Sequence, residues 1–117
     1  VVLADLTYPT SVEFDDAGNV YVAEGGFVYG DDVARARVLR FPAPGSGSTE
    51  TVADNLNGPV TDLLWHDRRL YISHRGKISV LERGEVRDLV TGLPSLGDHH
   101  NNQLAVGPDG KVYFGQG

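Results

Sequence analysis

The chain of 117 residues contains no cysteine. This absence excludes disulfide bonds, thiolate zinc sites and a cysteine nucleophile. The chain also contains no methionine, and it ends at Gln116-Gly117, so we expect both ends to be cuts through a longer protein. Residues 1–5 have no basic segment and are not a secretory signal peptide.

Basic residues are scarce as well, because 10 Lys and Arg stand against 16 Asp and Glu, for a net charge of −6. Binding to phosphate backbones needs the opposite sign, so the composition predicts no nucleic-acid partner and no anionic membrane surface. No apolar run approaches the roughly 18–20 residues that cross a bilayer. We therefore predict no membrane-spanning segment in this chain.

What the chain does have is a repeat. Residues 9–24, 60–74 and 103–116 each consist of a short apolar strand, a turn that carries Asp, and a second strand with an aliphatic residue before Tyr. These aliphatic residues are at positions 20, 70 and 112, so the copies are spaced by 50 and 42 residues. A period in the forties built of strand–turn–strand units is typical of β-propeller blades.

Two further strands fit between successive copies, at residues 37–41 and 50–53 and again at 77–81 and 85–90. No segment keeps the apolar spacing of a helix. The fold class predicted is all-β, a partial β-propeller of about two and a half four-stranded antiparallel blades. Blade 1 spans about residues 9–54, blade 2 about 60–91, and the first half of blade 3 about 101–117. A small β-sandwich is the alternative, since it also uses short strands.

The densest polar segment, Asp98–Gln103, directly precedes the third copy of the repeat. The connection into the innermost strand of a blade opens near the central channel, so a histidine there is a candidate general base and the amides are candidate hydrogen-bond partners of a polar substrate. A solvated loop is the alternative interpretation. Adjacent histidines diverge from a strand and no further ligands accompany them at metal-site spacing, so we predict no metal site within this chain.

The stretch Gly97-Asp98-His99, followed by Leu104 and by Gly107–Tyr113, resembles the soluble quinoprotein glucose dehydrogenases, also called the glucose/sorbosone dehydrogenases. At the level of blade pattern the resemblance extends over most of the chain, but only residues 97–113 are specific. It implies a six-bladed ring that binds pyrroloquinoline quinone (PQQ) with calcium. It further implies a sugar substrate, an external electron acceptor and a periplasmic or secreted location.

The resemblance also implies residue roles. His99 would be the general base that takes the proton of the sugar hydroxyl, with His100 as the reserve because the doubled histidine shifts the register by one. Asn57 and Asp98 are the candidate cofactor contacts, and Asn101 and Gln103 the candidate substrate contacts. The glucose-oxidising members have Gly-Arg where this chain has Asn102-Gln103.

The function predicted is thus the N-terminal part of a PQQ-dependent sugar dehydrogenase. In the family, the cationic cofactor contacts and the calcium ligands come from later blades, so we expect this chain alone to be inactive. Two alternatives stay open: an NHL-like or lactonase-like propeller, whose repeats also carry a Pro-Asp-Gly turn, and a non-catalytic propeller that binds a ligand or protein.

Overall fold

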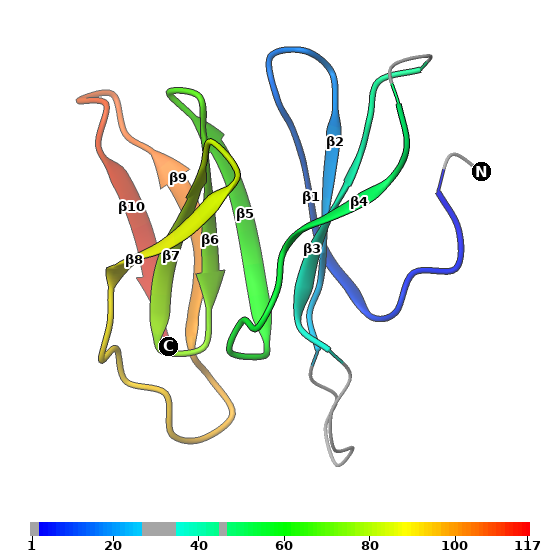
Figure 1. Ribbon diagram of the computed structural model, residues 1–117. Helices are drawn as coiled ribbons and strands as arrows, with labels where there is room; N and C mark the ends of the chain where they lie inside the picture. Colours follow the sequence, from blue (N-terminus) through cyan, green and yellow to red (C-terminus); the bar gives the residue numbers. More distant parts are fainter. Residues whose placement is uncertain (1–2, 27–34, 45–46) are drawn as a thin grey trace.

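The computed structural model describes residues 3–26, 35–44 and 47–117, and it confirms the prediction of an all-β chain (Figure 1). The described residues form three antiparallel sheets and no helix. None of them therefore forms a helix long and apolar enough to cross a membrane. The three sheets do not close into a ring within this part of the chain.

Each sheet is an up-and-down meander in which neighbours in sequence are neighbours in the sheet. The first sheet contains β1 (Pro9–Phe14), β2 (Val20–Glu24), β3 (Arg37–Phe41) and β4 (Glu50–Ala53). The second contains β5 (Val60–His66), β6 (Arg69–His74), β7 (Lys77–Glu82) and β8 (Glu85–Val90). The third consists of β9 (Asn101–Val106) and β10 (Val112–Gln116).

The aspartate of the repeat organises the first turn of a sheet. Asp15 Oδ1 accepts the backbone N–H groups of Ala17 and Asn19, both at 2.9 Å. Its other oxygen accepts the Tyr21 hydroxyl at 3.2 Å. In the third sheet, Tyr113 donates to Asp109 Oδ2 in the same way, at 2.8 Å. In the first and third sheets the Asp and Tyr of the repeat are therefore a hydrogen-bonded pair. This pair joins the turn to the second strand and satisfies the polar groups of a tight connection.

The first strand of every sheet carries an irregularity at the same place. The register shifts between Pro9 and Ser11 in β1 and between Val60 and Asp62 in β5. In the third sheet it shifts where Gln116 faces Asn101 and Phe114 faces Leu104. An extra residue of this kind bends a strand and re-aims its side chains. The three first strands are thus equivalent in geometry as well as in sequence.

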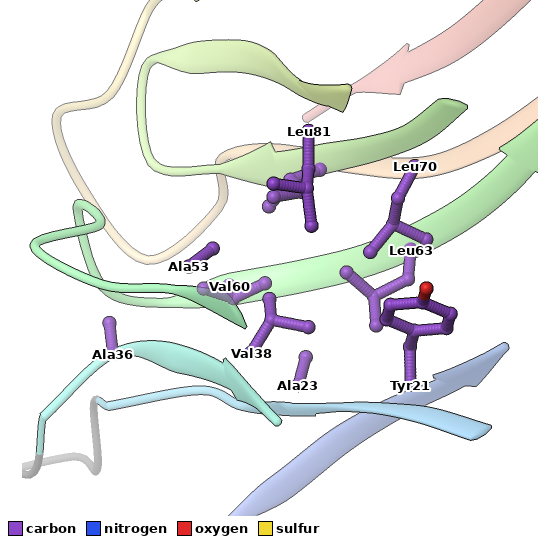
Figure 2. Close-up of a cluster of buried hydrophobic side chains, with 10 residues drawn as sticks. Tyr21, Ala23, Ala36, Val38, Ala53, Val60, Leu63, Leu70 and Leu81 are labelled. Carbon is purple, nitrogen blue, oxygen red and sulfur yellow. The ribbon is translucent and has the colours of Figure 1, made fainter. Parts of the chain in front are cut away.

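The main core lies between the first two sheets, whose apolar side chains point toward each other (Figure 2). Tyr21 and Trp65 stack across this boundary with ring centroids 6.0 Å apart. Around them pack aliphatic side chains from both sheets: Ala23, Val38, Val60, Leu63, Leu70 and Leu81. The second sheet lies between the other two, with β5 beside both β1 and β9 (Figure 1). The buried positions of β5, β6 and β7 follow from that place between the other sheets, whereas β8 is exposed along its whole length.

Candidate functional site

The predicted site residues other than Gln103 lie at one end of the sheets, where three connections meet. These are the β4–β5 connection with Asn57, the β6–β7 turn with Arg75, and the segment that leads into β9 with His99 and His100. The Asn57 side-chain amide donates to the carbonyl of Arg75 at 3.2 Å, and Arg75 N–H donates to the carbonyl of Asn57 at 3.0 Å. The first two connections are therefore joined by one side-chain and one backbone hydrogen bond.

His100 joins this group from the third sheet. Its side chain is 7% exposed, and its Nδ1 is buried without a hydrogen-bond partner among the described residues. Burial lowers the pKa of His100, and the charges of Arg75 and His99 lower it further against the opposing effect of Asp98. The imidazole is accordingly neutral near pH 7, with an unsatisfied ring nitrogen, which is a costly arrangement unless a ligand or water completes it.

His99 is exposed beside this buried imidazole. Opposite it, Gly117 donates its N–H to the carbonyl of His100 at 3.1 Å, which extends the β9–β10 ladder by one residue. A side chain at position 117 would come within 2.9 Å of the His99 Cβ. Glycine at this position therefore keeps the space beside His99 open.

Asn101, a predicted substrate contact, has a structural environment instead. Its side chain is fully buried, its Oδ1 accepts Gly76 N–H at 2.9 Å, and its Nδ2 lies within 3.0 Å of Ser73 Oγ and of the carbonyls of His74 and Lys77. All polar atoms of the amide are thus engaged inside the protein. Asn101 fixes the start of β9 to the β6–β7 turn and so positions the two histidines before it.

The other predicted contacts lie on the surface. Asn57 and Asp98 are exposed near the histidines, whereas Gln103 is exposed further along β9, and its side chain has no hydrogen-bond partner in the described part of the chain. The structure therefore brings together Asn57, Arg75 and the histidine pair, and it leaves Gln103 apart.

Sequence reasoning missed Arg75 at this end, and for His74 it noted only a place at the end of a strand, equivalent to Glu24 and Gln116 in the other copies. Arg75 is an exposed cation, and its guanidinium makes no ion pair with any described residue. His74 is buried, and its Nδ1 accepts Asn57 N–H at 3.0 Å. The only available signal was their position in the turn His74-Arg75-Gly76, where Gly76 has a positive φ of 76°.

His74 is satisfied on both sides of its ring. Because Nδ1 accepts a hydrogen bond, the neutral ring carries its proton on Nε2 and donates to Ser79 Oγ at 2.8 Å; Ser79 in turn donates to Asp88 at 2.7 Å. Burial lowers the pKa of His74 to about 4, against the attraction of Asp88. The ring is therefore neutral above pH 4, and it orients the connection that carries Asn57.

The site can thus offer a neutral buried imidazole, an exposed imidazole, a side-chain amide, and a guanidinium that has no ion pair within the described part of the chain. This set suits an anionic or hydroxylated ligand. Within the described ranges no three His, Asp or Glu side chains come together as a metal site. No protein-family model matches the chain, and no curated protein matches it either.

Proposed function

We propose that the three sheets are successive blades of a six-bladed β-propeller and that the chain is part of a PQQ-dependent sugar dehydrogenase. Support for the ring is the equivalence of the three first strands, each with the same register shift, lying side by side. Repeat units cannot bury their faces alone and stack on neighbours, as these sheets do.

The observation that carries the function is the convergence of the histidine pair, Arg75 and Asn57 at one end of the innermost strands. In a propeller that end opens on the channel, where ligands bind. PQQ carries carboxylates, and the unpaired guanidinium of Arg75 with the amide of Asn57 is a donor set that fits such an anion. The calcium ion would be held by sheets outside this chain, because the described residues contain no cluster of ligands for it.

In this proposal Arg75 and Asn57 would hold the cofactor, which would supply the hydride acceptor for the sugar carbon. His99 takes the proton of the reacting hydroxyl, since it is the exposed imidazole of the pair, and His100 is the reserve base. Burial lowers the pKa of His100, so the ring is neutral near pH 7 and its unpartnered Nδ1 can accept a hydrogen bond from a hydroxyl in one tautomer or donate one in the other. Asn101 contributes indirectly, because its side chain fixes the start of β9, directly after the two histidines.

The test is reconstitution of the complete ring-forming protein with PQQ and calcium, followed by dye reduction with several sugars. We expect sugar-dependent turnover that falls about 100-fold or more in His99→Ala, as is usual for a lost general base. His66→Ala, in the β5–β6 hairpin, is the matched control and should leave turnover unchanged. Absence of PQQ binding would remove the proposed class, and full activity in both His99→Ala and His100→Ala would remove the proposed base.

A further inference from the structure

A pocket lies between the first and second sheets, at the opposite end of the second sheet from the histidines. Its volume is about 350 Å³, which falls in the range of roughly 300–1,000 Å³ that small-molecule sites occupy. One wall comes from β2, β3 and β4, and the other from β5, β7 and the two hairpin turns β5–β6 and β7–β8 (Figure 1). Both walls are supplied by this chain, and the two sheets that carry them pack on each other through the main core.

One part of the pocket wall is apolar and aromatic. The stacked rings of Tyr21 and Trp65 both line the pocket, together with Val52 and Leu81. Trp65 is the only tryptophan of the chain, and its Nε1 is buried without a hydrogen-bond partner among the described residues. Aromatic rings in such a wall offer a flat surface on which a planar or apolar group can pack.

The other part of the wall is basic. Three arginines line the pocket, Arg40, Arg68 and Arg83, and the only carboxylate in its lining is Glu50. Arg40 Nη1 donates to Glu50 Oε1 at 2.9 Å, whereas Arg68 and Arg83 make no ion pair with any residue that the structure describes. The lining thus carries a net charge of +2 in a chain whose net charge is −6. A concave surface of this kind attracts anions.

The two unpaired arginines occupy turn positions that disfavour arginine. Arg68 is the second residue of the two-residue β5–β6 turn and has a φ of 59°. Arg83 is the first residue of the two-residue β7–β8 turn and has a φ of 53°. Asparagine and glycine adopt a positive φ at lower cost and are the preferred residues of such turns. Arginine at both positions therefore points to a role beyond forming the turn.

We propose that this pocket binds a small organic anion, whose carboxylate or phosphate group is held by Arg68 and Arg83 while its planar or apolar part packs on Trp65. Guanidinium groups bind both kinds of oxyanion through paired N–H donors. The pocket lies at the other end of the sheets from Asn57 and Arg75. The inference is therefore independent of the proposed quinone site, and either can fail without the other.

Titration with phenyl phosphate and with benzoate tests the pocket, and the indole N–H resonance of Trp65 in NMR spectra reports its occupation. The resonance is assigned by its loss in Trp65→Phe. We expect a saturable shift with a Kd at or below about 1 mM for at least one of the two anions, which also distinguishes a phosphate from a carboxylate ligand. Benzyl alcohol lacks the anionic group and inorganic phosphate lacks the ring, so each should bind at least about tenfold more weakly.

Asparagine substitutions separate binding from folding. Arg68→Asn and Arg83→Asn suit the positive φ of the turns, so the Tm should not fall. Each should nevertheless raise the Kd of the bound anion about tenfold or more, because a hydrogen bond between charged groups is lost. Arg87→Gln on β8, outside this pocket, is the control and should leave the Kd unchanged.

Three results would overturn the proposal. The first is that neither anion shifts the Trp65 resonance. The second is that benzyl alcohol or inorganic phosphate binds as tightly as the organic anion. The third is that either asparagine variant keeps the affinity of the unmodified protein. Because no cofactor enters the titration, each of these failures is distinct from a failure to bind PQQ.

Discussion

The second and third sheets each bury a histidine at the same end of the molecule, but the two rings have different surroundings. His74 uses both ring nitrogens, one for Asn57 N–H and one for Ser79. His100 is nearly as buried, yet its Nδ1 has no partner in the described part of the chain. Burial lowers the pKa of both rings, so a shifted pKa alone does not distinguish structure from function. The two rings do differ in hydrogen bonding, because the unpartnered Nδ1 of His100 leaves a buried polar atom for a ligand or water to complete.

The second and third sheets thus have different roles at this end of the molecule. In the second sheet both ring nitrogens of His74 have partners, and the ring holds the neighbouring connections in place. The third sheet is attached to it through the buried side chain of Asn101 and through Leu104 N–H, which Asp62 accepts. It leaves His99 exposed, and it buries His100 with one ring nitrogen unpartnered among the described residues. Each substitution or change of pH considered next alters one of these two sheets or the contacts that join the sheets.

Asn101→Ala should produce the largest effect, because it leaves Gly76 N–H and several buried acceptors of the second sheet without a partner. We expect the free energy of unfolding to fall by about 3 kcal/mol or more. Asn102→Ala, at the exposed neighbouring position, is the control and should cost less than about 0.5 kcal/mol. Urea denaturation measures both, and equal losses would show that Asn101 does not anchor the third sheet.

The burial of the His74 ring predicts that the free energy of unfolding depends on pH. Its folded pKa of about 4 lies below the ordinary 6.5, so the unfolded chain binds more protons between these values. The free energy of unfolding should therefore fall as the pH is lowered from 6.5 to 4, by up to about 3 kcal/mol. His100 contributes in the same direction, because burial lowers its pKa as well.

His74→Phe separates the two contributions. The variant should be less stable at pH 7, because Asn57 N–H and Ser79 lose their partner, but its stability should change less between pH 6.5 and 4. Urea denaturation at a series of pH values gives the slope. An unchanged slope would place the titration elsewhere and contradict the assignment to His74.

Asp62→Ala tests the contact between neighbouring sheets. The variant loses the acceptor of both Leu104 N–H and the Ser11 hydroxyl, at an expected cost of about 1–3 kcal/mol. Hydrogen exchange at the Leu104 amide should accelerate. Asp16→Ala, in an exposed turn, is the control and should change neither quantity. Retained protection at Leu104 would mean that this side chain does not join the sheets.

Arg75→Gln should have the smallest effect on stability, since the side chain is exposed and unpaired among the described residues, and we expect less than about 0.5 kcal/mol. It should nevertheless raise the pKa of His100 toward its ordinary value, because the arginine charge lowers it. Titration of the imidazole by NMR measures this, with Arg87→Gln on β8 as the control. A His100 pKa that is the same in both variants would place Arg75 outside the site.

The strands could be predicted from the sequence because they depend on local alternation and on the turn residues of a repeat. The strands at 37–41, 50–53 and 85–90 begin and end as the pattern predicts. The repeat also located the histidines at the start of a strand. The three-sheet arrangement follows from the same periodicity, since each copy begins a new sheet.

The roles of single side chains could not be predicted, because they depend on contacts across the fold. The Asn101 side chain donates hydrogen bonds to residues that lie 24–28 positions earlier in the chain. Nothing in the sequence distinguishes Asn101 from its exposed neighbour Asn102. Arg75 resembles any exposed arginine until the fold places it near His100. Which of two adjacent histidines is buried depends on the register of β9, which the doubled residue leaves open in the sequence.

An experimental structure of the assembled protein with its remaining sheets tests the central claim most directly. We expect six sheets around one axis, first strands innermost, with the imidazoles of His99 and His100 and the guanidinium of Arg75 at the mouth of the axial channel. A two-layer sandwich, or a ring in which these three side chains point to the outer rim, would contradict the account.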